Sequence, residues 1–123
     1  MQKYVQFLEK KNLSLNFDSN NFKIQPDYEE DMRESNSKIM NIISDRTPFF
    51  LGGSADVSAT CHTYLTKEQD FNYNSYSGKS IFYGVREHAM ASITNGLATY
   101  NLRPFAATFL TFADYLKPRL RLA

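Results

Sequence analysis

Apolar residues recur at helical spacing in two segments of the chain, which predicts two amphipathic helices. The first runs from Tyr28 to Ser44, with Asp27 as its expected N-cap. The second runs from Glu87 to Tyr100 and contains Gly96. Close packing of another backbone against Gly96 would explain why the helix tolerates its cost of roughly 1 kcal/mol relative to alanine. The two apolar faces are formed by Met32, Ile39, Met40 and Ile43, and by Met90, Ile93, Leu97 and Tyr100.

Short apolar runs between the helical segments predict buried strands. The first run stops at Gly52-Gly53, where a tight loop is expected. Residues 54–79 have a loop-like composition, and residues 110–122 predict a last helix that Pro118 kinks or interrupts. This alternation predicts an α/β fold with a partial, mainly parallel sheet and flanking helices. The expected strands are residues 49–51, 81–83 and 105–108.

Composition and charge limit the size of the protein and the kinds of partner that can be expected. The 123 residues suffice for roughly one domain, and a net charge of +1 gives no reason to expect a nucleic-acid or membrane partner. Cys61 is the only cysteine, and no signal peptide or long apolar run is present, so a cytoplasmic protein is expected. Residues 1–27 are polar and are interpreted as a linker or N-terminal arm.

Two acidic residues follow expected strands, where parallel α/β folds bind ligands. Asp56 ends the run Gly-Gly-Ser-Ala-Asp, and Glu87 begins the second helix. A helix start favours an ionised Glu87, whereas burial would favour its protonated form, so this carboxyl group could share a proton with a basic ring nitrogen. The ordinary alternatives are a solvated turn residue for Asp56 and compensation of the helix dipole for Glu87. The neighbouring His88 is interpreted either as a structural residue or as one that supports the residues of the site without contacting the ligand.

Three aromatic residues recur every three positions near the end of the chain: Phe109, Phe112 and Tyr115. Their spacing places them near one face of a helical turn. Such rings could surround a flat heterocycle, or could form an ordinary core stripe.

The order and spelling of these motifs resemble transketolase. The matching runs lie in the family's order and at near-family spacing, over roughly residues 28–123. The resemblance is to the domain that holds the pyrimidine end of thiamine diphosphate. Because the chain ends inside an expected helix, a C-terminally truncated domain is expected. The runs are Leu51-Gly-Gly-Ser-Ala-Asp56, Tyr83-Gly-Val-Arg-Glu-His-Ala-Met90, Asn95-Gly96 and Thr108-Phe-Leu-Thr-Phe112.

The resemblance implies roles for individual residues. Glu87 matches the glutamate that hydrogen-bonds a ring nitrogen of the aminopyrimidine and activates the cofactor. Arg33 and Thr60 match contacts to the sugar phosphate, although the family usually has a serine in place of Thr60. Cys61 and His62 stand where the family more often has Asn and an apolar residue. The other implied cofactor contacts are Asp56, Phe109, Phe112 and Tyr115.

The resemblance also implies an activity. Transketolases transfer a two-carbon ketol unit from a ketose phosphate to an aldose phosphate, using thiamine diphosphate and a magnesium or calcium ion. Their active sites lie between the subunits of a homodimer, where the partner's diphosphate-binding domain supplies the metal site. The Gly-Asp-Gly metal motif is absent here, so the metal ligands are expected outside the chain, and the chain alone is expected to be inactive.

Alternatives remain open at this point. Other thiamine diphosphate enzymes share the glutamate at the helix start; they include deoxyxylulose-phosphate synthase, the pyruvate dehydrogenase beta subunit and dihydroxyacetone synthase. A non-catalytic split or decayed subunit that only binds a partner chain is a second alternative, and a stand-alone binding module is a third. The preferred sugar phosphates do not follow from the sequence.

Overall fold

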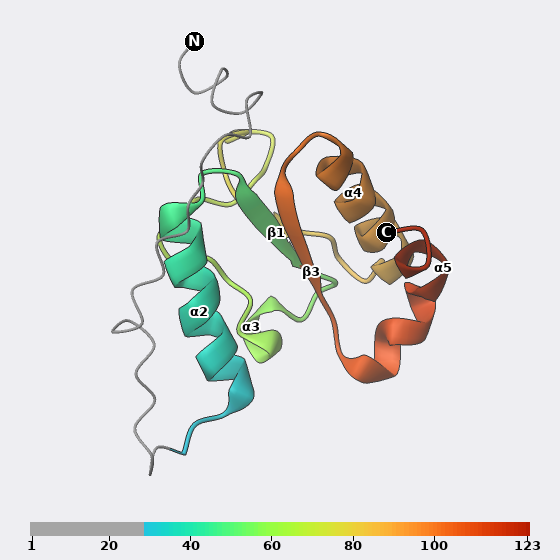
Figure 1. Cartoon of the computed structure of the whole chain (residues 1–123), viewed down its shortest axis with the longest axis horizontal. Helices are drawn as coiled ribbons and strands as arrows, with labels where there is room; N and C mark the ends of the chain where they lie inside the picture. The colour runs from blue at the N-terminus through green and yellow to red at the C-terminus, as the bar shows by residue number, and fades with distance from the viewer. Residues whose placement is uncertain (1–28) are drawn as a thin grey trace.

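Helices cover both faces of a short parallel sheet (Figure 1). The computed structural model describes residues 29–123, so the expected arm at residues 1–27 and the expected N-cap Asp27 lie outside the described residues. The strand order is β2-β1-β3, which confirms the predicted α/β fold with a mainly parallel sheet. In chain order the elements are α2 (Met32–Arg46), β1 (Phe50–Ser54), α3 (Ser58–Cys61), β2 (Ser80–Phe82), α4 (Glu87–Thr99), β3 (Arg103–Ala107), the 3-10 helix η2 (Leu110–Tyr115) and α5 (Lys117–Leu120).

Helix α2 begins later than the apolar pattern predicted. Its N-cap is Asp31, whose side chain accepts a hydrogen bond from the Arg33 backbone N–H at 2.8 Å. The prediction of a start at Tyr28 was therefore wrong, because the capping carboxylate fixes the first turn further along the chain. Met32 is exposed and Met40 is buried, so only the later part of the predicted apolar face reaches the core.

Strand β1 contains the two glycines that were expected to form a loop. Gly52 pairs with Ser80 of β2 and with Phe105 of β3, so the strand continues through Gly52-Gly53 to Ser54. A Cβ at Gly52 would lie 2.0 Å from the Phe105 carbonyl oxygen, and one at Gly53 would lie 1.7 Å from that of Ile81. The glycines are therefore required by the close approach of both neighbouring strands, and the prediction of a loop there was wrong.

Helix α4 begins at Glu87, as predicted, and its first turns complete the core. Met90 is fully buried and packs with Ala55 and Tyr83. Gly96, however, has no atom within 4 Å of the position that its Cβ would occupy, among the residues that the structure describes. The expected close backbone contact at Gly96 is therefore absent from this part of the chain.

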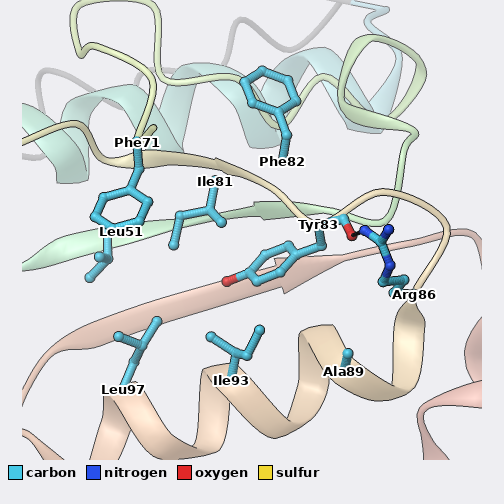
Figure 2. A pocket seen from close by; sticks show the side chains of 9 residues that line it. All are labelled: Leu51, Phe71, Ile81, Phe82, Tyr83, Arg86, Ala89, Ile93 and Leu97. Atoms are coloured by element: carbon cyan, nitrogen blue, oxygen red, sulfur yellow. Dashed lines mark hydrogen bonds between the residues drawn. The ribbon is translucent and has the colours of Figure 1, made fainter. Parts of the chain in front are cut away.

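The apolar stripe of α4 also lines an open groove. Figure 2 shows α4 on one side and residues of β1, β2 and the adjoining loops on the other, with Arg86 at one end. The groove encloses about 490 Å³. Its lining residues are Leu51, Phe71, Ile81, Phe82, Tyr83, Arg86, Ala89, Ile93 and Leu97.

The C-terminal region is two short helices rather than one. A 3-10 helix, η2, ends at Tyr115, and α5 begins at Lys117 with Pro118 in its first turn. Proline suits a first turn because the backbone N–H that it lacks has no partner within the helix there. The interruption that Pro118 predicted is thus confirmed, but the residues before it form a tighter helix than expected.

Candidate functional site

The loops that follow the three strands leave the sheet from one edge. Ser54, at the end of β1, is in register with Phe82 of β2 and with Ala107 of β3. Just beyond the strands, the Tyr83 backbone N–H donates to the Ser54 carbonyl at 3.3 Å, and that of Ala55 donates to Ala107 at 3.3 Å. The carboxyl edge therefore gathers segments that are far apart in the sequence. The predicted site residues on these segments are Asp56, Glu87, Phe109, Phe112 and Tyr115.

Glu87 is the first residue of α4 and is buried, with 7% of its surface exposed. Within residues 29–123 its carboxylate has no hydrogen-bond or ion-pair partner. The helix N-terminus favours a negative charge at this position. The Glu87 oxygens are not among the buried side-chain atoms that lack a partner in the described residues, so they remain accessible to a donor from a bound ligand.

The turn before α4 explains why Arg86 does not donate to the Glu87 carboxylate. Its Nη1 turns back and donates to the Tyr83 carbonyl at 3.0 Å, as the dashed line in Figure 2 marks. Its backbone N–H donates to Gly84, which has a φ of 64° in the left-handed region that favours glycine. This turn directs the Arg86 guanidinium to a backbone carbonyl. The guanidinium therefore forms no hydrogen bond with the carboxylate of Glu87, the first residue of α4.

Asp56 is exposed, lies two residues after the end of β1 and has a φ of 65°. Aspartate tolerates this left-handed conformation better than most residues do. The turn is held by Ser54, whose fully buried hydroxyl accepts from the Val57 N–H at 3.2 Å and lies 2.7 Å from the Ser58 hydroxyl. No role for Ser54 was predicted from the sequence. The available signal was a second serine, Ser58, four residues further along the same turn.

The three aromatic residues follow β3 at the same edge. Phe109 precedes η2, and its ring centroid lies 6.0 Å from that of Phe112. A 3-10 helix has three residues per turn, so side chains three positions apart are aligned. Phe112 remains 37% exposed and Tyr115 65% exposed, and neither belongs to the buried core. Within residues 29–123 the two rings are therefore accessible to a ligand.

Arg33 and Thr60, predicted to share a phosphate, lie in contact. The Arg33 Nη1 donates to the Thr60 main-chain oxygen at 3.1 Å, across 27 positions of sequence. Thr60 lies in the single turn of α3, within the segment expected to be mostly loop. Arg33 also forms an ion pair with Asp31, a residue that was not predicted to belong to the site.

The charges around Arg33 shift each other's ionisation. Its hydrogen bonds to Asp31 lower the pKa of that carboxyl from 3.8 to about 2. The same contacts raise the pKa of the Arg33 guanidinium above its ordinary value. Partial burial raises the pKa of the nearby Cys61 thiol. Around neutral pH the cluster is thus an ionised Arg33–Asp31 pair beside a protonated thiol.

His88 connects helix α4 to helix α5 through a hydrogen bond. The Arg119 Nε donates to its Nε2 at 3.0 Å, and Asn95 Nδ2 donates to the Arg119 carbonyl at 2.9 Å. These two bonds tie α5 to α4. They also use the lone pair that a catalytic base would need, so His88 is engaged in packing of the helices.

Residues 29–123 hold neither a metal-ligand cluster nor a membrane-spanning helix. No group of three or more histidine, cysteine, aspartate or glutamate side chains is arranged to hold a metal ion in this range. No helix in it has both the length and the apolar character needed to cross a membrane.

The chain forms an α/β domain with a largely buried glutamate, Glu87, at the carboxyl edge of its sheet. The family model for the transketolase pyrimidine-binding domain matches residues 29–123, so the chain belongs to this family. It is 41% identical over 100 residues to the transketolase of Aquifex aeolicus, covering 79% of this chain. It is 44% identical over 92 residues to that of Bacillus subtilis, covering 74% of this chain. The chain spans 14% of the length of each of these relatives.

Solved structures agree with this assignment. A transketolase of Pichia stipitis in complex with sedoheptulose-7-phosphate superposes with a TM-score of 0.86 at 31% identity, covering 98% of this chain and 20% of the other. The Campylobacter jejuni transketolase gives a TM-score of 0.75 at 38% identity, covering 99% and 18%. The predicted resemblance to transketolase is confirmed, and the rival thiamine diphosphate enzymes are no better supported.

Proposed function

We propose that this chain binds and activates the aminopyrimidine of thiamine diphosphate within a transketolase. The complete enzyme would transfer a two-carbon ketol unit from a ketose phosphate to an aldose phosphate. The observation that carries the proposal is Glu87 at the start of α4: the residue is 7% exposed, and its carboxylate has no hydrogen-bond or ion-pair partner in residues 29–123. A basic ring nitrogen that shares a proton with this carboxylate would satisfy it.

The residues present fit such a ring. Glu87 would hold a proton against the ring nitrogen, and the rigid strand-turn-helix connection would fix its position. Phe109, Phe112 and Tyr115 would contact the ring, and Asp56 would lie toward the thiazolium side. When bound, the cofactor supplies the electron sink for cleavage of the carbon–carbon bond.

Arg33 and Thr60 would bind the phosphate of the sugar. A guanidinium matches the geometry of a phosphate anion, and Thr60 would contribute its hydroxyl. The contact between the two residues supports this assignment, because it places a cation and a hydroxyl-bearing turn side by side.

The remaining components of the enzyme would come from elsewhere. We propose a homodimer in which a partner's diphosphate-binding domain supplies the ligands for magnesium or calcium, in a cytoplasmic setting. In this arrangement the chain alone has no ketol transfer activity. Ketol transfer by the purified chain, without a diphosphate-binding domain, would contradict this proposal.

The decisive experiment is Glu87→Gln in the complete enzyme, with Glu34→Gln as the matched control. Glu34 also lies in the first turn of a helix but is exposed. General acid–base assistance contributes about 10²- to 10⁴-fold, so hydrogen–deuterium exchange of the thiazolium ring proton should slow by at least about 100-fold in the Glu87 variant. Exchange at the wild-type rate, with the cofactor bound, would remove Glu87 from this role.

A further inference from the structure

The Arg33 guanidinium is already engaged by an internal carboxylate. Its Nε lies 3.1 and 3.0 Å from the two oxygens of Asp31, and its Nη2 forms an ion pair with Oδ2. The Arg33 and Asp31 side chains are 49% and 41% exposed, so solutes can reach both. Asp31 therefore occupies the fork that an oxyanion would use, and does so within reach of solvent.

Asp31 is also held in place by the helix. One of its oxygens accepts the Arg33 backbone N–H at 2.8 Å and thereby caps α2. The carboxylate loses this cap if it moves away. Arg33, in contrast, has a long side chain with five N–H donors, of which Thr60 takes one through its carbonyl. When an anion binds, the guanidinium is the more mobile partner and the carboxylate stays close by.

We propose that Asp31 is a fixed internal counter-ion that competes with the substrate phosphate for Arg33 and so weakens the binding of phosphorylated sugars. The inference rests on the proposed role of Arg33 in binding phosphate. The pair has no net charge, so a phosphate gains less attraction here than it would from a free guanidinium. Asp31 would thus set affinity and release of phosphorylated ligands without touching the reacting atoms.

The pH dependence separates this role from a structural one. The other titratable groups that act on the pair are Glu34 in α2, and Cys61 and His62 at the end of α3. Arg33 lowers the pKa of Asp31 to about 2, so the Asp31 carboxylate keeps a constant negative charge near neutral pH. A phosphate monoester gains its second charge near pH 6, so its repulsion by Asp31 should increase between about pH 5.5 and 8.

The test compares Asp31→Asn with the wild type in the complete holoenzyme. Asparagine caps helices about as well as aspartate does, so α2 should be retained. One unit charge a few ångströms from a dianion, in a solvent-like dielectric and at moderate salt, predicts a KM for the phosphorylated ketose about three- to tenfold lower. The KM for the same ketose without its phosphate should change by less than about twofold on the same grounds.

Two controls isolate the contact. Glu34→Gln removes one charge from the same helical turn without freeing the fork, and should change the KM by less than about twofold. Sulfate, which is a dianion throughout this pH range, should inhibit the Asp31→Asn enzyme more strongly than the wild type by a ratio that does not vary with pH. For the phosphorylated ketose, the ratio of the wild-type KM to the Asp31→Asn KM should rise with pH. The same rise is expected when His62 is replaced by Gln.

The outcomes distinguish this inference from the function on which it rests. If Arg33→Gln leaves the KM for the phosphorylated ketose unchanged, the proposed phosphate site is wrong. If Arg33→Gln raises this KM while Asp31→Asn leaves it unchanged or also raises it, the competition is refuted. Should the Asp31→Asn variant fold poorly, Asp31→Ser retains an N-cap oxygen without the charge and must show the same lower KM.

Discussion

Gly53→Ala should destabilise the sheet, because the new methyl group would occupy the space of a neighbouring backbone. Its Cβ would lie 1.7 Å from the Ile81 carbonyl oxygen, whereas ordinary contacts begin at 3.4 Å. That oxygen belongs to β2, so relief requires the two strands to separate and the ladder of Gly52, Gly53 and Ser54 with β2 to open.

The magnitude follows from the hydrogen bonds lost. The ladder pairs three residues of β1 with β2, so at about 1 kcal/mol for each pair its opening costs about 3 kcal/mol. The lower entropy of the unfolded alanine chain offsets about 0.4–1 kcal/mol, which leaves a net destabilisation of about 2–3 kcal/mol. Hydrogen exchange of the β1 peptide, followed by mass spectrometry in the full-length protein, should show roughly 30- to 150-fold faster exchange for this loss.

Gly96→Ala is the matched control, since it makes the same chemical change in open space. Gly96 has no neighbour within 4 Å of its would-be Cβ in residues 29–123, and its φ is not positive. Alanine should therefore stabilise α4 by about 0.5–1 kcal/mol. If Gly53→Ala left exchange in β1 unchanged, the close approach of β2 would be wrong. If Gly96→Ala destabilised the full-length protein, another segment or chain would pack at that position.

Two more substitutions test the site. Phe112→Ala should weaken cofactor binding by about 1–3 kcal/mol if its ring contacts the pyrimidine, whereas Tyr76→Ala, another truncation of an exposed aromatic residue, should leave the affinity from calorimetry unchanged; equal affinities in both variants would refute the contact. The effect of Asp31→Asn on thermal stability should depend on pH, because the substitution removes the ion pair with Arg33. Arg33 lowers the folded-state pKa of Asp31 from 3.8 to about 2, so the stabilisation is present above about pH 4 and is lost as the pH falls toward 2. Thermal midpoints of variant and wild type should therefore differ at pH 5 and converge as the pH approaches 2; a constant difference would contradict the shift.

Several features followed from the sequence alone because they depend on local periodicity. The alternation of apolar runs and helical stripes predicted the parallel α/β fold, and the change in period after Tyr83 located the start of α4 at Glu87. The joint spelling of the motifs around Asp56, Glu87 and Phe112 indicated the family, which the family model confirmed. Roles for Glu87, Asp56 and the aromatic residues remain predictions.

Other features were decided by tertiary structure, because they depend on which backbone lies next to which. Gly52 and Gly53 have the sequence of a loop, and only their pairing with two neighbouring strands shows that they belong to β1. The start of α2 depended on which of two aspartates caps the helix. The contact of Arg33 with Thr60 joins residues 27 positions apart, and no local pattern encodes such a distance. The sequence thus determined which elements form, while packing determined how close their backbones come and which charges share one site.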